Sequence, residues 1–280
     1  MNRHHPILVI GGTGKTGRRV AAKLAAAGHV VRATSRSGPF VFDWNDPAGW
    51  AAILQGVQAA YVTYQPDLAV PGSEAAIAAF TKQAAVAGIR HLVLLSGRGE
   101  PEAAACEAIV QGSGLHWTIL RANWFMQNFS ETFFVEGIRA GELALPAVDI
   151  PEPFIDADDI ADVAVAALTD IGHTGQVYEL SGPRALTFAE AVAEIAAATG
   201  REIRFSPVPI DAFAEGLRAY GLPEDMIALV RYLFTTVLDG RNSETRDGVL
   251  RALGRAPRDF ADYAQGAAGV WAPALRAAQG

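Results

Sequence analysis

Three glycines spaced three residues apart follow an apolar segment near the start of the chain. The segment ILVI, residues 7–10, continues as GGTGKTG, which places Gly11, Gly14 and Gly17 at this spacing. A glycine loop that opens a helix directly after a buried strand can hold a pyrophosphate, because its backbone N–H groups and the helix N-terminus attract negative charge. The pattern indicates a dinucleotide loop. A plain strand-to-helix turn is the alternative.

The same loop contains Gly14-Lys15-Thr16, which matches the end of the triphosphate loop G-x-x-x-x-G-K-[ST]. That loop would need its first glycine at position 9, where the chain has Val9. The loop is therefore too short for a triphosphate, and Lys15 is either an accessory phosphate contact or a solvated side chain. The expected pyrophosphate contacts are Gly11, Gly12, Thr13, Gly14, Lys15, Thr16 and Gly17.

The end of the second apolar segment, residues 29–34, decides which dinucleotide the sequence favours. NAD-binding proteins place an Asp or Glu here for the ribose 2′-hydroxyl, whereas NADP-binding proteins use Arg. The sequence reads ATSRS, so that Ser35 and Arg36 offer a hydroxyl and a guanidinium, and the next carboxylate is Asp43. These groups suit a 2′-phosphate and favour NADP(H) over NAD(H). The alternative is that Arg36 is an ordinary surface arginine.

Strand-like and helix-like segments that could position these residues alternate along the first 182 residues. This alternation predicts an α/β fold with a Rossmann, doubly wound parallel sheet. We expect strands at 7–10, 29–34, 40–42, 59–63, 91–95, 117–121, 151–155 and 176–180. We expect helices at 15–27, 46–54, 72–87, 102–112 and 156–168. The NAD(P)-binding domain would span 1–182 with a substrate-side insertion around 124–150, and 183–280 would form a mostly helical substrate-side region.

Composition restricts the possible partners and the compartment. The chain has 280 residues, of which 50% are hydrophobic and 19% charged, with a net charge of −7. This acidic balance argues against a nucleic-acid partner. The single cysteine, Cys106, excludes an internal disulfide framework, and no His/Cys spacing indicates a metal site. Because the apolar run ILVI that follows MNRHHP is too short for a signal h-region and no apolar run could span a membrane, we expect a cytoplasmic protein with no membrane partner.

Several stretches together resemble the NmrA-like family of atypical short-chain dehydrogenases. This family includes NAD(P)H-dependent quinone and azo-dye reductases, ergot-alkaloid reductases and redox-sensing regulators. The resemblance covers nearly the whole chain but is not specific for a substrate. The matching stretches are GGTGKTG, FDW at 42–44, LVLLSG at 92–97, SGLHWTILRANWFMQNF at 113–129, PFIDADDIADVAVAAL at 153–168, YELSGPRALTFAEA at 178–191 and GRAPRDFADYA at 254–264.

The resemblance implies further cofactor contacts, all at the carboxyl ends of predicted strands. Arg36 would bind the 2′-phosphate, and the loop from Asn123 to Asn128 would cover the nicotinamide. The remaining implied contacts are Asp43 and Trp44 by the adenine, Thr63, Tyr64 and Gln65 along the cleft, Ser96 and Gly97 by the nicotinamide ribose, and Asn123, Trp124 and Phe125 over the nicotinamide.

The chain departs from typical short-chain dehydrogenases in its chemistry. Those enzymes use a Tyr-x-x-x-Lys pair on one helix turn, in which the tyrosine gives a proton and the lysine lowers its pKa. The lysines here are Lys15, Lys23 and Lys82, and none follows a tyrosine at that spacing. Many NmrA-like members also lack the pair. We therefore expect hydride transfer to an acceptor that needs little proton assistance, and we assign no catalytic residue.

Aromatic residues after the strand at 117–121 suit stacking on a flat acceptor. The candidate substrate contacts are Trp124, Phe125, Met126 and Phe129. Packing inside the protein explains these aromatic residues equally well. Arg98 could hold an acidic substrate or a phosphate, although a surface ion pair with Glu100 or Glu102 is the simpler interpretation.

Two functions remain open from the sequence. The leading hypothesis is an NADPH-dependent oxidoreductase that passes hydride to a small, flat, electron-poor acceptor such as a quinone, azo or iminium compound. The alternative is a non-catalytic redox sensor that binds NADP(H) and acts through a protein partner. An epimerase or dehydratase is a weaker hypothesis, because those reactions normally use the missing Tyr/Lys pair. A homodimer is compatible with the sequence but is not specified by it.

Overall fold

The computed structural model describes residues 5–147 and 149–272 of the chain. The two predicted domains, 1–182 and 183–280, also include residues 1–4, 148 and 273–280, which lie outside the described residues. Contacts divide the chain into two compact units. The sheet unit comprises the chain up to Asn123, Ala157–Ser181 and Arg246–Pro257, and the helical unit comprises Trp124–Asp156, Gly182–Thr245 and the chain from Arg258 onward. The sequence placed one boundary at 182, whereas the chain passes between the two units several times.

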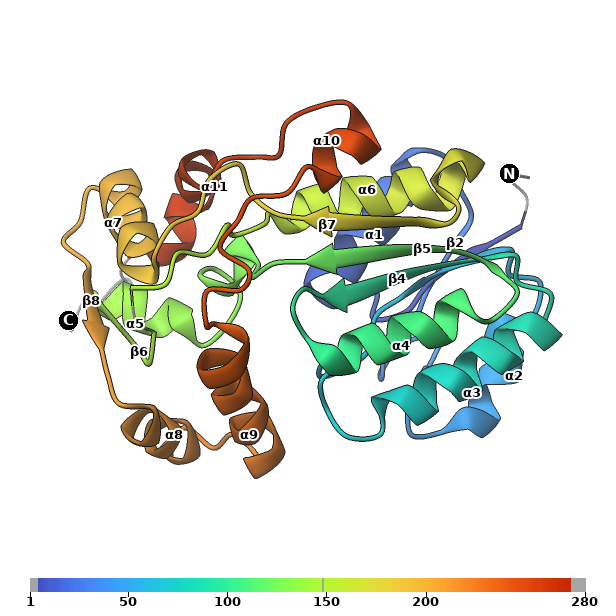
Figure 1. The fold of residues 1–280 in the computed structure, drawn as a ribbon, viewed down its shortest axis with the longest axis horizontal. Helices are drawn as coiled ribbons and strands as arrows, with labels where there is room; N and C mark the ends of the chain where they lie inside the picture. The colour runs from blue at the N-terminus through green and yellow to red at the C-terminus, as the bar shows by residue number, and fades with distance from the viewer. Residues whose placement is uncertain (1–4, 148, 273–280) are drawn as a thin grey trace, which may run out of the picture. The chain divides into compact units, whose positions relative to one another are not determined.

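The sheet unit contains one parallel sheet in the strand order β2-β1-β3-β4-β5-β7 (Figure 1). Its strands are β1 (Ile7–Val9), β2 (Val31–Ala33), β3 (Ala59–Val62), β4 (His91–Gly97), β5 (His116–Ala122) and β7 (Gln176–Leu180). Every adjacent pair is parallel. The order reverses at β1, because β2 lies on one side of it and β3 on the other. A ligand of such a sheet binds at this reversal, outside the carboxyl ends of the strands.

Helices cover both faces of this sheet, which explains why its central strands are apolar along their length. β1 and β3 are buried at every residue. The helices of this unit are α1 (Lys15–Ala26), α2 (Trp50–Leu54), α3 (Ser73–Val86), α4 (Pro101–Gln111), α6 (Ala157–Thr169) and α10 (Gly248–Leu253), with the short turns η1 (Pro47–Gly49) and η3 (Ile171–His173). α1 packs against α6, and α3 packs against both α2 and α4. The doubly wound α/β fold predicted from the sequence is confirmed.

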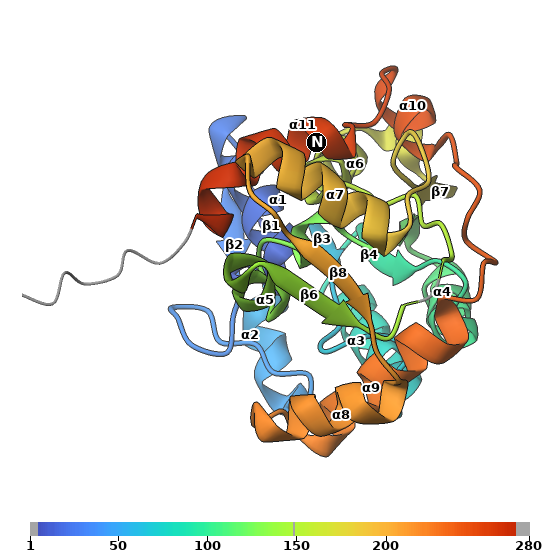
Figure 2. The ribbon, with the colours of Figure 1, turned by 90° about the vertical axis from the view of Figure 1, so that its left-hand side faces the viewer.

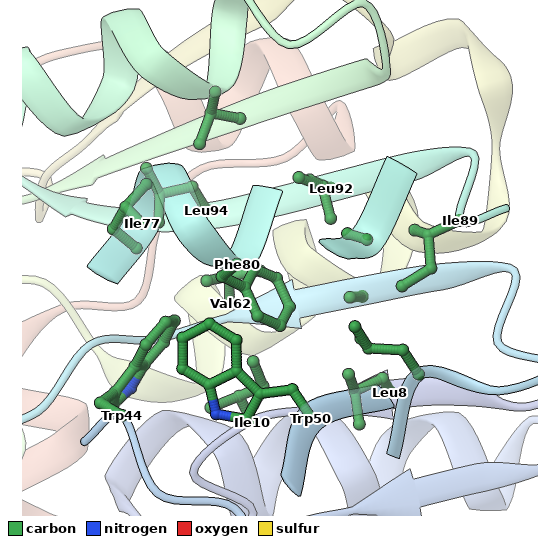
Figure 3. Packing of buried hydrophobic residues seen from close by; sticks show 14 of the residues in the cluster. Leu8, Ile10, Trp44, Trp50, Val62, Ile77, Phe80, Ile89, Leu92 and Leu94 are labelled. Carbon is green, nitrogen blue, oxygen red and sulfur yellow. The ribbon is translucent and has the colours of Figure 1, made fainter. Parts of the chain in front are cut away.

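One face of the sheet contributes most of a large hydrophobic core. Leu8, Leu92 and Leu94 point from the strands toward α3, where Ile77 and Phe80 meet them (Figure 3). Alternate residues of a strand point to opposite faces, so this one set of strand residues fixes which face holds the core. The core holds the strand ends, and the loops that follow them, in place.

Two predicted strands are not strands in the structure. Around residues 40–42, only one isolated parallel bridge forms, between Ser35 and Val41, and Val41 is exposed. Residues 151–155 form isolated bridges at Glu152 and Ile155. Neither segment has a neighbouring strand that continues the ladder, and Pro151 and Pro153 have no N–H group to donate to one.

The helical unit is built around a two-stranded parallel sheet of β6 (Glu142–Leu145) and β8 (Arg204–Pro207) (Figure 2). Its helices are α5 (Phe134–Ala140), α7 (Phe188–Thr199), α8 (Ile210–Ala219), α9 (Glu224–Tyr232) and α11 (Phe260–Ala267), with the short segments η2 (Met126–Asn128), η4 (Leu233–Val237) and η5 (Ala268–Trp271). The described chain after residue 183 is mostly helical, as predicted, but the pairing of β6 with β8 was not predicted. Within the described part of the chain, no helix is both long and apolar enough to cross a membrane.

Candidate cofactor site

The turn from β1 into α1 is formed by glycines whose neighbours leave no space for side chains. Gly11 has φ +69°, in the left-handed region that favours glycine. A Cβ on Gly12 would lie 2.8 Å from the Cβ of Ala33, and one on Gly17 would lie 2.1 Å from the carbonyl oxygen of Gly11. The helix therefore packs on the turn at backbone distance, and only glycine permits this approach.

No side chain caps the N-terminus of α1. Its N-cap is Gly14, with extended backbone at φ −75° and ψ 174°, and no acidic residue lies in the first turn. Thr13 is exposed, while Thr16 is buried. The first N–H groups of a helix have no partner within the helix, and the helix dipole is positive there. The geometry and charge of this turn therefore fit an anionic group such as a pyrophosphate.

The loop after β3 contacts the glycine turn. The hydroxyl Oγ1 of Thr63 donates to the carbonyl oxygen of Ile10 at 3.0 Å, and a Cβ on Gly11 would lie 2.7 Å from that hydroxyl. The side-chain amide nitrogen of Gln65 lies 3.9 Å from where a Cβ on Gly14 would stand. Thr63 and Gln65 thus lie beside the turn, at the point where the strand order reverses.

The end of β2 carries a cation that none of the described residues neutralises. Arg36 is exposed, and no described residue forms a hydrogen bond or an ion pair with its guanidinium. The hydroxyl of Ser35 donates to the carbonyl oxygen of Ser37 at 2.5 Å. Asp43 is exposed, and its Oδ1 accepts from the Asn45 N–H at 2.9 Å. Arg36 is therefore available to an outside anion.

Trp44 belongs to the core of the sheet unit. Its ring meets those of Trp50 and Phe80 at centroid distances of 5.6 and 5.5 Å (Figure 3). It also meets the ring of Tyr64 at 5.0 Å, and it is 9% exposed. Its indole nitrogen donates to the carbonyl oxygen of Thr63 at 3.1 Å. Trp44 therefore links the segment after β2 to the loop after β3. Tyr64 keeps more exposed surface than Trp44 does.

Ser96, near the end of β4, points toward α4. Its hydroxyl donates to Oε1 of Glu107 at 2.6 Å, and Arg121 from β5 donates to both oxygens of that carboxylate. These hydrogen bonds raise the pKa of Arg121 above its ordinary value. Where the Tyr-x-x-x-Lys pair would stand, α4 buries Ala103, Cys106, Glu107 and Val110.

Arg98 is buried, so it is not the surface arginine that the simpler interpretation expected. Its side chain is 4% exposed, its Nη1 donates to Oδ1 of Asn123 at 3.0 Å, and its Nε lies 3.9 Å from Oε2 of Glu179. The parallel register explains this contact, because residues 97 and 122 are partners and the chain places residues 98 and 123 next to each other. The sequence alone could not show that register.

The sequence analysis missed a pair of carboxyl groups at this edge of the sheet. Asp67, in the loop after β3, and Glu100, just after β4, share a hydrogen bond between their side chains. Both residues follow strands that pair in parallel. The signal in the sequence was that both residues follow adjacent strands. The two loops have different numbers of residues before the acidic side chain, so the sequence did not show that these side chains meet.

The predicted substrate contacts of the helical unit divide into two groups. Trp124 and Phe125 are half-buried and keep accessible aromatic surface. Trp124 packs edge-on against Phe188, with ring centroids 5.5 Å apart. Met126 is 1% and Phe129 0% exposed, so both are core residues of this unit. Packing therefore explains Met126 and Phe129, and their burial does not support the predicted contact with substrate.

Two family models match the chain. The NmrA-like family model matches residues 102–264, and an NAD(P)H-binding model matches residues 11–171. The chain belongs to the NmrA-like family. The resemblance drawn from the sequence is thus confirmed, and this NmrA-like chain contains an NAD(P)H-binding domain. Among the described residues, no group of three or more His, Cys, Asp or Glu side chains could hold a metal ion.

Several relatives that match over nearly the whole chain are reductases. The (4-alkanoyl-5-oxo-2,5-dihydrofuran-3-yl)methyl phosphate reductase of Streptomyces griseus is 35% identical, covering 95% of this chain and 99% of that protein. The NAD(P)H azoreductase of Xenophilus azovorans is 30% identical, covering 96% and 100%. An NADPH-dependent quinone oxidoreductase from Escherichia coli, solved with NADPH, has the same fold, with a TM-score of 0.74 at 21% identity, covering 93% of this chain and 99% of that one. This NmrA-like protein therefore belongs to a family of NAD(P)H-dependent oxidoreductases.

Proposed function

We propose that this NmrA-like protein is an NADPH-dependent reductase of flat, electron-poor acceptors such as quinones, azo compounds or iminium ions. The observation that carries the proposal is that Arg36, which follows β2, is exposed and has no partner among the described residues, while the N-cap of α1, Gly14, has no side-chain cap. A guanidinium at this place distinguishes a ribose 2′-phosphate from a 2′-hydroxyl.

The proposed cofactor contacts follow the carboxyl edge of the sheet. The backbone from Gly11 to Gly17 would hold the pyrophosphate, and Ser35 with Arg36 would hold the 2′-phosphate. The other proposed contacts are Asp43, Trp44, Thr63, Tyr64, Gln65, Ser96, Gly97 and Asn123. When bound, the reduced nicotinamide supplies a hydride, and the protein orients it and excludes water.

The class of acceptor follows from what α4 lacks and from what the helical unit offers. Without a Tyr/Lys pair, the chain has no standard donor for carbonyl reduction, which favours acceptors that take up a hydride readily. Trp124 and Phe125 keep aromatic surface that suits stacking on a flat ring. Relatives that act on an azo compound, a quinone and an unsaturated lactone support the same class.

A titration followed by an acceptor panel tests this function. Purified protein is titrated with NADPH and with NADH, and quinone, azo, iminium and unsaturated-lactone acceptors are then added while the nicotinamide absorbance is followed. We expect NADPH to bind about tenfold or more tightly than NADH, because the 2′-phosphate gains a charge-assisted bond. We also expect loss of absorbance that depends on the acceptor. Oxidation no faster than the blank across the whole panel contradicts the proposal.

A redox sensor is the second candidate, and the absence of the Tyr/Lys pair from α4 favours it. In this case the protein binds oxidised and reduced cofactor without turning over any acceptor. It would also retain a protein partner in one of the two cofactor states. Efficient turnover of any acceptor in the panel rejects this candidate.

A further inference from the structure

Asp67 and Glu100 meet at the carboxyl edge of the parallel sheet. β3 ends at Val62 and β4 ends at Gly97, and the two strands pair in parallel. The loops that follow them must therefore lie at the same edge, where an open parallel sheet binds its ligand. The side chains of Asp67 and Glu100 form a hydrogen bond there.

Gly97 makes the space in which the carboxyl group of Glu100 lies. A Cβ on Gly97 would lie 2.2 Å from Oε1 and 2.4 Å from Oε2 of that carboxyl group. Gly97 is not among the glycines with positive φ, so its conformation alone does not require glycine. Glu100 is the N-cap residue of α4, yet its side chain makes no cap hydrogen bond. The carboxyl group thus lies against the end of β4 and does not cap the helix.

The pair can form its hydrogen bond only when one of the two groups carries a proton. Ionised carboxylates accept hydrogen bonds but cannot donate them, and two of them repel each other. Glu100 is 8% exposed, and its Oε2 is buried. Oδ1 of Asp67 accepts from the Ala69 N–H at 2.9 Å. A donor favours the charged form, so the negative charge belongs on Asp67 and the proton on Glu100.

Burial and the acidic groups around Glu100 keep it protonated. The groups that face it are Asp67, from the loop after β3, and Glu102, from α4, and both are acidic. Arg98, two residues earlier in the chain, donates to Asn123 and lies 3.9 Å from Glu179. Burial, followed by the charge of Asp67, raises the pKa of Glu100 well above its ordinary range. Glu100 therefore holds a proton at neutral pH.

We propose that Glu100 donates the proton in the reductase reaction and that Asp67 positions this proton. The proposal rests on the proposed function. Reduction of a quinone or an azo group requires a hydride and a proton. The hydride brings two electrons from the nicotinamide, which is oxidised, and the acceptor is reduced. The O–H bond of Glu100 breaks while an O–H or N–H bond forms on the acceptor, which leaves Glu100 as a carboxylate until water returns a proton.

Iminium acceptors separate the hydride transfer from the proton transfer. An iminium carbon that receives a hydride becomes a neutral amine without further protonation. In Glu100→Gln, which keeps the shape of the protonated acid, we expect quinone and azo turnover to fall by about 10²-fold or more. Iminium turnover should stay within about twofold of the wild-type rate. Glu74→Gln, at an exposed carboxylate on α3, is the matched control and should leave all three rates unchanged.

An infrared difference spectrum provides a readout that is independent of turnover. The carbonyl stretch of a protonated carboxylic acid should be present at neutral pH in the wild type and in Glu74→Gln, and should be lost in Glu100→Gln. A spectrum without that difference overturns the proposal. If Glu100→Gln does not fold, the pH profile of the wild type decides. Quinone turnover should then fall as the pH rises through the pKa of Glu100, while iminium turnover stays level, and parallel profiles overturn the donor role.

The two proposals fail in different ways. A wild-type protein that reduces no acceptor overturns the proposed function and, with it, the donor role. Quinone turnover that is present in the wild type and unchanged in Glu100→Gln overturns the donor role alone.

Discussion

The turns that follow β1 and β4 have the same topology and opposite electrostatics. Each joins a central strand to a helix at the carboxyl edge of one sheet. α1 begins at a glycine, with no side-chain cap and no acid in its first turn, whereas α4 has Glu100 as its N-cap and Glu102 in its first turn. Each of these two turns thus presents a helix N-terminus, and the acidic side chains make the second one less favourable for an anion.

The glycines of the two turns also serve different purposes. At Gly17, the missing Cβ lets the helix backbone approach the backbone of the turn, because the carbonyl oxygen of Gly11 occupies the place of a Cβ. At Gly97, the missing Cβ makes space for the carboxyl group of Glu100. Under the two proposals, the same residue type would prepare a phosphate site after β1 and a proton site after β4.

Filling the first turn should have the largest effect. In Gly17→Ala the new methyl group meets a backbone carbonyl, which cannot move aside as a flexible side chain can. We expect dinucleotide binding to be lost and the free energy of unfolding to fall by about 1–3 kcal/mol. Denaturant unfolding and NADPH titration measure the two effects. Gly216→Ala, in α8 with open space around it, is the control and should be neutral or slightly stabilising. Unimpaired NADPH binding by Gly17→Ala would show that the turn holds no pyrophosphate.

Removing the cation beside the first turn should have the next largest effect. In Arg36→Ala we expect NADPH affinity to fall by about tenfold to a hundredfold, which corresponds to about 1.5–3 kcal/mol, while NADH affinity stays the same. Parallel fluorescence titrations with the two cofactors give this ratio. Arg90→Ala, at an exposed arginine just before β4, should change neither affinity. An equal loss for both cofactors would mean that Arg36 does not read the 2′-phosphate.

The proton site of the second turn should make stability depend on pH. The folded-state pKa of Glu100 is raised above the ordinary 4.5, so its contribution is fully present below that pH and is lost as the pH rises toward the raised value. The loss is at most about 1.4 kcal/mol per pH unit for one proton. Glu100→Gln removes this proton, so its unfolding free energy should fall less between pH 5 and about pH 8. Identical slopes in urea unfolding of the two proteins would place the raised pKa elsewhere.

The smallest expected effect concerns the acid in the first turn of α4. Glu102→Gln removes a favourable interaction with the helix dipole of about 0.3–1 kcal/mol and also removes one negative charge that faces Glu100. We therefore expect a slight loss of stability at low salt that disappears at high salt. We also expect a shift of the quinone pH profile to lower pH. Thermal unfolding at two ionic strengths measures the first effect, and a salt-independent loss would point to packing instead.

The sequence by itself determined the doubly wound sheet and the glycine turn. Both are local signals, because an apolar strand followed by GGTGKTG fixes the turn and the start of α1 within a few residues. The sequence also predicted Arg36 as a cofactor contact, because this residue follows the second strand directly in the chain. The strand predicted at 40–42 was wrong because pairing depends on a neighbour that the local sequence does not contain.

Only the tertiary structure decided which side chains meet. The parallel register of β4 with β5 brings Arg98 to Asn123, and that of β3 with β4 brings Asp67 to Glu100. The tertiary structure also buries Phe129 and leaves Trp124 half-buried, although both lie in the same aromatic stretch. The physical reason is that register and burial depend on contacts between segments far apart in the chain, whereas a glycine turn depends only on its own residues.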